Sequence, residues 1–276
     1  MAVEQYKPTT PARRGMTTAD NSDVTNSKPR KSLTATQRSK AGRNNTGRIT
    51  TRHRGGGVKR RYRLIDYKLA PGTKATVESI EYDPNRTSHV ALVKIDTDQY
   101  AYIIAGSKMK VGDEIEVGEE VAIRPGNRMP LAEIPLGSSI YNIEMTQGKG
   151  GQLVRSAGAR ARLTSKEGDW GYVRLPSGEV RLIHLKCYAT LGNVGNEQHQ
   201  NIKVGSAGRN RRKGKRPSVR GKAMNPADHH MGGGEGKTGP GRIPKTPWGK
   251  TAIGKKTRSR KRGSDMIVRS RHKRKR

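Results

Sequence analysis

The chain of 276 residues has no phenylalanine, a single cysteine and few apolar residues of any kind. Hydrophobic residues make up 30% of it and aromatic residues 4%, whereas an average soluble domain is about 45–50% apolar. One core therefore cannot enclose the whole chain. The lone thiol, Cys187, excludes an intramolecular disulfide and a metal site built from several cysteines. Its neighbours favour a strand, so we expect a buried structural thiol.

Long hydrophobic runs are missing as well. No segment approaches the roughly 18 apolar residues that a membrane-spanning helix requires. The first 30 residues also lack the apolar centre of a signal peptide. We therefore expect a cytoplasmic protein without a membrane partner.

Acidic residues are scarce at both ends of the chain. Residues 1–71 contain 17 Lys and Arg against 4 Asp and Glu, residues 196–276 contain 25 against 4, and residues 72–195 contain 15 of each. The net charge of +34 therefore arises entirely outside the middle. Such basic, apolar-poor ends bury too little surface to offset their ordering entropy. They need a polyanion, and nucleic acid favours binding by releasing counterions. The alternative is that the positive charge only increases solubility. This alternative is weaker, because repulsion among so many like charges needs a compensating partner.

The middle of the chain has the pattern of short strands separated by turns. Turn residues at 83–86 and 176–178 interrupt the pattern, and a break at 125–127 marks a domain boundary. Strands are expected at residues 73–82, 89–95, 100–104, 114–117, 138–145, 159–164, 170–175 and 179–185. Their spacing favours small β-barrels without long helices.

Both ends have the composition of extended arms. Residues 1–51 are polar and show no apolar period, and residues 52–63 form a basic glycine hinge. From residue 196 onward, Gly and Pro interrupt runs of Lys and Arg and exclude a long helix, although a short helical piece is expected near 205–213. Glycine lets backbone approach phosphate closely, so residues 52–63 and 149–155 are predicted to contact nucleic acid.

Two motifs suggest chemistry that their surroundings do not support. Residues 231–238 imitate a phosphate-binding P-loop, but Met231 stands where the first glycine is required and Pro240 interrupts the helix that should follow. His229 and His230 are too few for a zinc site. A glycine-rich arm also lacks the rigid pocket that acid–base catalysis by an imidazole needs.

The two tryptophans lie in different contexts. Trp170 falls within an expected strand, so we expect it in the core. Trp248 lies in the C-terminal arm, where stacking on a base and anchoring against protein are equally favoured interpretations.

Several segments spread over nearly the whole chain follow the pattern of one known family. The most specific is RGKAMNPADHHMGGGEG at residues 220–236, followed by TPWG at 246–249. The other segments are VEQYKPTTPARRGM (3–16), GRNNTGRITTRHRGGGVKRRY (42–62), IEYDPNR (80–86), GKGGQLVRSAG (148–158), LPSGE (175–179) and residues 254–258. Together they resemble the universal family of large-subunit ribosomal protein two in its bacterial form, except that Met231 replaces the second histidine of the family's glycine loop.

The resemblance implies a mainly β fold with four parts. These are an extended basic N-terminal arm (1–59), an OB-fold-like RNA-binding barrel (60–127), an SH3-like barrel (128–196) and an extended Gly/Pro-rich basic C-terminal arm (197–276).

The resemblance also implies a function without catalysis by the protein. The protein would be a structural constituent of the large ribosomal subunit that binds rRNA near the peptidyl-transferase region. It would support subunit assembly, subunit association and tRNA binding. Its partners would be large-subunit rRNA, small-subunit rRNA across the subunit interface and neighbouring ribosomal proteins. It would be a monomer within the ribosome, with Mg²⁺ bound only through rRNA.

The expected RNA contacts are cations, glycines and a few polar or aromatic side chains, with most contacts made to phosphates. The residues are Arg52, His53, Arg54, Gly55, Gly56, Gly57, Lys59, Arg60, Arg61, Arg63, Arg86, Lys149, Arg155, Arg209, Arg211, Arg212, Lys213, Arg216, Arg220, Asn225, His229, Gly232, Gly233, Gly234, Lys237, Arg242, Trp248, Lys255, Lys256 and Arg258. The rival hypotheses are direct peptidyl transfer by His229 and a free nucleic-acid chaperone or regulator.

Overall fold

The chain forms two compact units in the computed structural model, which describes residues 3–96, 99–236, 239, 241, 243–255 and 265–271. One unit, which we call the body, comprises Met1–Arg38, Lys59–Arg209 and Asp265–Arg276. The other, which we call the arm unit, comprises Ser39–Val58 and Asn210–Ser264.

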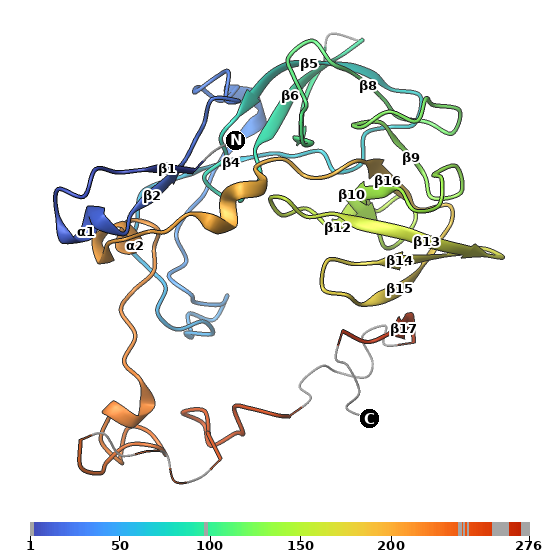
Figure 1. The fold of residues 1–276 in the computed structure, drawn as a ribbon. Helices are drawn as coiled ribbons and strands as arrows, with labels where there is room; N and C mark the ends of the chain where they lie inside the picture. The colour runs from blue at the N-terminus through green and yellow to red at the C-terminus, as the bar shows by residue number, and fades with distance from the viewer. Residues whose placement is uncertain are drawn as a thin grey trace. The chain divides into compact units, whose positions relative to one another are not determined.

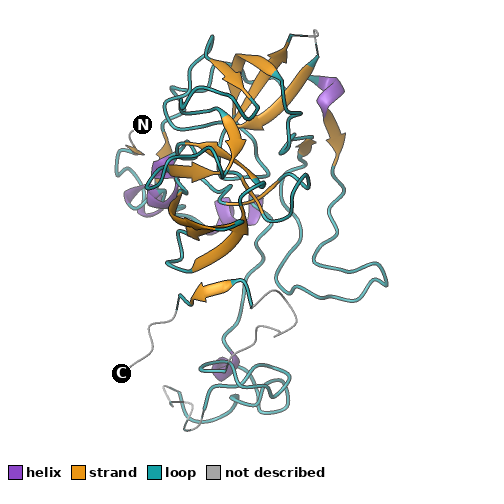
Figure 2. Cartoon of the chain, turned by 90° about the vertical axis from the view of Figure 1, so that its right-hand side faces the viewer, coloured by secondary structure: helices purple, strands orange, loops and turns teal. Residues whose placement is uncertain are grey.

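Strands predominate over helices in the body, as Figures 1 and 2 show. The strands are β1 Val3–Gln5, β2 Thr17–Ala19, β3 Thr34–Thr36, β4 Arg61–Arg63, β5 Lys74–Glu81, β6 Val90–Ile95, β7 Tyr100–Ile104, β8 Glu114–Glu116, β9 Arg128–Pro130, β10 Ser139–Tyr141, β11 Ile143–Glu144, β12 Gly151–Leu153, β13 Ala161–Glu167, β14 Trp170–Arg174, β15 Val180–His184, β16 Tyr188–Leu191 and β17 Ile267–Arg269. The helices are α1 Pro11–Arg14 and α2 Ala207–Arg212, with 3-10 turns at Lys31–Leu33, Glu197–Asn201 and Gly221–Ala223. The expectation of a mainly β protein is confirmed, since the strands form several antiparallel sheets.

The first sheet has the strand order β7-β6-β5-β8, and all four strands begin and end within one residue of their expected bounds. Ala75, Val77 and Ile80 of β5 all reach its core. Strict alternation would turn one of them outward, and a bulge between Val77 and Ser79 restores the inward direction. The bulge is thus the consequence of an irregular apolar pattern in β5.

The outer face of this sheet is covered by the N-terminal segment. Strand β6 is apolar on both faces, and its Val90 and Leu92 pack with Tyr102 in a second cluster that Leu33 helps to cover. Strand β3 pairs with β4, and the Thr25 backbone N–H donates to the Ile80 carbonyl at 2.9 Å. Residues 3–38, which composition assigns to an extended arm, therefore belong to the body because the sheet offers them an apolar face.

The second sheet has seven strands in the order β17-β15-β14-β13-β10-β16-β9. The expected strand 138–145 is divided into β10 and β11 at Asn142, whose φ is +49°. Cys187 lies in the core with no exposed surface, and burial raises the pKa of its thiol to about 11. The expectation of a buried structural thiol is thus confirmed.

Two other expectations for this sheet are corrected. Trp170 was expected in the core, but 36% of its surface is exposed and its ring meets the edge of the His184 ring. It begins β14 at the end of the sheet, where neighbouring strands cover only part of the ring. Strand β17 was expected to be part of an extended arm, yet it pairs with β15, and Leu182 N–H donates to the Met266 carbonyl at 2.8 Å.

A buried ion pair joins β4 to β5. The Nε and Nη2 atoms of Arg63 donate to Oε2 of Glu81 at 3.1 and 3.0 Å, and both side chains are almost completely enclosed. The Tyr102 hydroxyl also donates to Glu81 and accepts the backbone N–H of Arg30 at 2.9 Å. Burial raises the pKa of Tyr102, although the Arg30 N–H opposes the rise. The network therefore fixes the N-terminal segment to the first sheet.

We expect Arg63→Met to lower the free energy of unfolding by about 3–5 kcal/mol, because it leaves the Glu81 carboxylate buried without its cation. Denaturant unfolding of the two proteins measures the difference. Lys74→Met is the matched control, since Lys74 pairs with Glu116 at the surface and 70% of its side chain is exposed. Equal effects of the two substitutions would contradict the role assigned to the Arg63–Glu81 pair.

Candidate nucleic-acid interface

The expected basic segment 52–63 is divided between the two units. In the body, Lys59 and Arg61 are exposed, whereas the Arg60 guanidinium donates to the Pro84 carbonyl at 3.0 Å. Arg63 is enclosed and paired with Glu81, so it is withdrawn as a phosphate ligand. The correction has a physical cause: two fully buried carboxylates, those of Glu81 and Asp83, lie within reach of its guanidinium.

A stacked cluster brings together two cations that are distant in the sequence. Arg86 pairs with Asp83 at 2.6 Å and donates to the Tyr67 hydroxyl at 2.5 Å. Burial acts to lower the pKa of Arg86, but the Asp83 carboxylate and Tyr67 outweigh it, so this pKa is raised. Arg155 lies over the Tyr67 ring at 4.4 Å and donates to the Gly151 carbonyl at 3.1 Å. Tyr67 thus orients both arginines, and Arg155 remains exposed.

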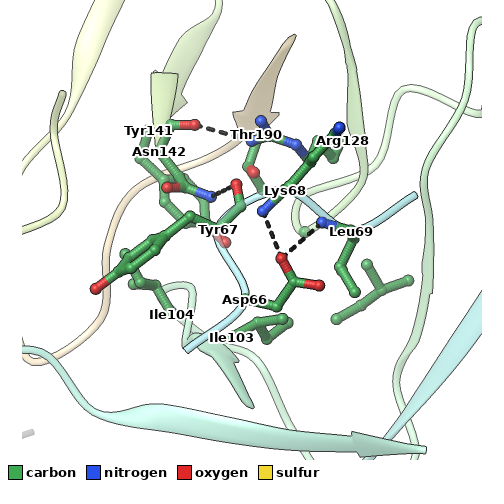
Figure 3. A pocket seen from close by; sticks show the side chains of 12 residues that line it. Asp66, Tyr67, Lys68, Leu69, Ile103, Ile104, Arg128, Tyr141, Asn142 and Thr190 are labelled. Carbon is green, nitrogen blue, oxygen red and sulfur yellow. Dashed lines mark hydrogen bonds between the residues drawn. The ribbon is translucent and has the colours of Figure 1, made fainter. Parts of the chain in front are cut away.

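A small pocket lies at the junction of the two sheets behind this cluster, and the Tyr67 ring points away from Asp66 in Figure 3. Arg128 closes the junction by donating to Glu144 at 2.9 Å and to the Asn142 carbonyl at 2.9 Å. Burial lowers the pKa of Arg128, and Glu144 opposes this effect. The pocket therefore has a structural explanation, because Arg128 is paired with Glu144 and the Asp66 carboxylate accepts the backbone N–H groups of Lys68 and Leu69.

The arm unit contains the glycine run and the start of the C-terminal arm, joined by backbone pairing. Gly55 N–H donates to the Gly214 carbonyl at 3.1 Å, Val58 N–H to the Arg212 carbonyl at 3.0 Å, and Arg216 N–H to the His53 carbonyl at 3.1 Å. We call residues 53–58 together with residues 212–216 the clasp. The expected RNA ligands that lie in it or beside it and are exposed are Arg52, Arg54, Gly56, Gly57, Arg211, Arg212, Lys213 and Arg216, while His53 and Gly55 are half-buried.

The glycine loop after residue 224 folds around His229. His229 is only 8% exposed, and its Nδ1 accepts the Met231 N–H at 3.0 Å. The loop closes through Gly233 N–H, which donates to the Met224 carbonyl at 3.0 Å. His229 was expected to hydrogen-bond RNA, but in this structure its ring faces inward and braces the loop. Asn225, in contrast, is exposed.

Met231 and Trp248 occupy neighbouring parts of the same unit. The Met231 sulfur accepts the Lys245 backbone N–H at 3.2 Å, which gives this residue a structural role. Thr246 N–H donates to the Lys250 carbonyl at 2.7 Å and closes a turn that presents Trp248, of which 70% is exposed.

The remaining expected ligands differ in accessibility. Arg209 belongs to the body, is half-buried and donates to the Thr17 carbonyl at 3.1 Å. Lys149, Arg220, Gly233, Gly234 and Lys255 are exposed, and Gly232 is half-buried. Lys237, Arg242, Lys256 and Arg258 lie outside the described residues.

Two tyrosines in the interface were not anticipated from the sequence. Tyr67 supports Arg86 and Arg155, and the guanidinium of Arg86 lies 5.7 Å from the centre of the Tyr62 ring. The only signal in the sequence is the placement of each tyrosine within a basic segment. No cluster of three potential metal ligands occurs within the described residues.

A β-rich body with a separate cationic unit of glycine backbone and exposed side chains defines a nucleic-acid-binding protein of the mainly β class. Comparisons with known proteins are more specific. The model described as Ribosomal Proteins L2, RNA binding N-terminal domain, matches residues 30–117, and that of Ribosomal Proteins L2, C-terminal domain, matches residues 124–249. The large ribosomal subunit protein uL2 of Paracoccus denitrificans (strain Pd 1222) is 51% identical over 273 residues, which cover 99% of this chain and 98% of that protein.

The chain belongs to the family of large ribosomal subunit protein uL2. The resemblance inferred from the sequence motifs is thus confirmed. As a member of this family the chain is a structural ribosomal protein and not an enzyme. Among the helices of its described residues, none has both the length and the apolar character needed to cross a membrane.

We expect Gly221→Ala to displace His229, because a Cβ at Gly221 would lie 2.4 Å from the His229 ring. The Met231 N–H would then lose its acceptor, so its amide hydrogen exchange should accelerate. Gly208→Ala is the control, since no atom lies within 4 Å of a Cβ placed there. Unchanged exchange at Met231 in the Gly221 variant would contradict the bracing role of His229.

Proposed function

We propose that this chain is a structural constituent of the large ribosomal subunit that binds rRNA through its arm unit and the exposed cations of its body. The observation that carries the proposal is the charge of the arm unit. Ser39–Val58 and Asn210–Ser264 together contain 22 Lys and Arg and only 2 Asp and Glu. The described backbone pairing in this unit does not reduce that charge, so a polyanion must do so.

The body supports the proposal by presenting a second, smaller basic surface. The first sheet would form part of the OB-fold-like barrel proposed for residues 60–127, and most of the second sheet would form part of the SH3-like barrel proposed for residues 128–196. Lys59 and Arg61 are exposed at the start of the first, and Arg155 is exposed beside it. These barrels would set the position of the protein, and phosphate contacts from both units would fix it on folded RNA.

The glycine loop and the Trp248 turn suit a place near the peptidyl-transferase region. Each is closed by its own hydrogen bonds, and Trp248 and Asn225 are exposed for stacking and hydrogen bonding. There the protein would support assembly, tRNA binding and association with the small subunit through its rRNA. It would act as a monomer beside neighbouring ribosomal proteins, with Mg²⁺ held only by rRNA. The reaction itself would belong to the RNA.

We expect the protein to bind transcribed large-subunit rRNA with an affinity that falls steeply with salt. For about 6–10 phosphate contacts, the loss between about 50 and 200 mM salt should be about 10³–10⁵-fold, because each contact releases counterions. Filter binding over a salt series measures the slope, and nuclease footprinting in the same samples locates the protected nucleotides.

Small-subunit rRNA at the same concentrations is the control for charge alone. A flat salt response, or equal protection of both RNAs, would contradict a primary large-subunit rRNA binder. Sedimentation of cell extracts distinguishes the alternative of a free chaperone or regulator, which requires most of the protein to lie outside ribosomes.

A further inference from the structure

Two cations oppose each other directly within the clasp. Arg54 and Lys215 are partners in an antiparallel bridge, and hydrogen bonds between Gly55 and Gly214 and between Arg216 and His53 flank it on either side. Directly opposed residues of an antiparallel pair carry their Cβ atoms about 4.5–5.5 Å apart on the same face, and like charges placed there are destabilising. Backbone pairing therefore holds two positive charges together.

No acidic residue of the two segments can compensate this pair. Residues 39–58 and 210–227 contain no Asp or Glu at all. The ion pairs found within the described part of the chain lie in the body and involve neither Arg54 nor Lys215. The opposed pair therefore suits an anion from outside the protein.

The glycines of the clasp leave room for such an anion beside the backbone. Gly57 is required by packing, since a Cβ there would lie 2.9 Å from the Arg212 carbonyl oxygen and from the Gly214 nitrogen. Gly56 faces open space, with no atom within 4 Å of a Cβ placed on it. The clasp is therefore tight between its two segments and bare on its outer side.

We propose that Arg54 and Lys215 hold one RNA phosphodiester between them, and that the two arms consequently engage RNA as a single element. This inference rests on the proposed rRNA binding and specifies one of its sites. It differs from the expectation of two independent extended arms that the composition suggests. The phosphate would offset the repulsion between the two cations and stabilise the backbone pairing, because it attracts both of them at once.

Cross-linking tests whether the clasp forms. In an Arg54→Cys, Lys215→Cys protein, the opposed Cα atoms should lie about 4.5–5.5 Å apart, within the range that a disulfide spans. We expect a 54–215 disulfide by peptide mapping, because the backbone pairing of the clasp brings these two positions together. The natural Cys187 interferes little, since its thiol is buried. Arg54→Cys with Val219→Cys is the mismatched control, and equal rates for the two pairs would overturn the clasp.

A double-mutant cycle tests the shared phosphate. Arg54→Gln and Lys215→Gln should each reduce the slope of log affinity against log salt by less than one unit, because the remaining cation still contacts the shared phosphate. The double variant should lose about one unit. A loss of about two units would show two separate phosphates and overturn the proposal.

Glycine substitutions separate failure of the clasp from failure of rRNA binding in general. Gly57→Ala should weaken rRNA binding and leave the salt response of the remaining contacts steep, whereas Gly56→Ala should weaken it much less. Both positions have positive φ, but +99° at Gly57 is less accessible to an L-residue than +64° at Gly56, so backbone strain and the clash both act at Gly57. Equal affinities of the two variants would overturn the clasp. A wild-type protein without a steep salt response would instead refute the proposed function itself.

Discussion

Repulsion among like charges is the constraint on which the rest of this structure depends. A chain with a net charge of +34 and only 30% hydrophobic residues cannot collapse as one globule. In this chain the charge-balanced segments are separated from the strongly cationic ones. The acidic residues gather in the middle, where they match the basic ones, and the body folds there around ordinary apolar cores. The excess cations lie in segments whose described contacts are mainly backbone hydrogen bonds, which form whatever the side-chain charge.

The buried carboxylates also remove some of the body's arginines from its surface. Glu81 and Glu144 are both enclosed, and each takes one arginine into the interior. Arg63 and Arg128 consequently count toward the net charge but not toward the surface that meets RNA. Arg86 is an intermediate case, because Asp83 neutralises it while Tyr67 orients it beside the exposed Arg155. The electrostatic surface of the body is therefore smaller than its composition suggests.

The sequence predicts some elements well and others poorly for physical reasons. Strands β5 to β7 are long enough for apolar residues to show a period, and β8, although it has only three residues, alternates charged and apolar side chains. Strands β9 and β17 have three residues each and pair with the distant strands β16 and β15, so they leave no local signal. Arg63 was assigned to RNA for a similar reason, since charge alone does not reveal that Glu81 lies opposite. Glycine–arginine runs correctly mark the clasp segments, but their mutual pairing is invisible in the pattern.

Pairing of residues so distant in sequence requires an explanation, because closing a long flexible loop has an entropic cost that grows with its length. Arg54 and Lys215 are separated by the longest segment of the body, Lys59–Arg209. Once the body has folded, that intervening chain is no longer flexible, and only the short segments 54–59 and 209–215 remain to be ordered. The body therefore contributes to RNA recognition beyond its own surface: its folding shortens the loop whose closure brings the two cationic segments together. Repulsion between Arg54 and Lys215 then still opposes the pairing, and in our proposal an RNA phosphate offsets it.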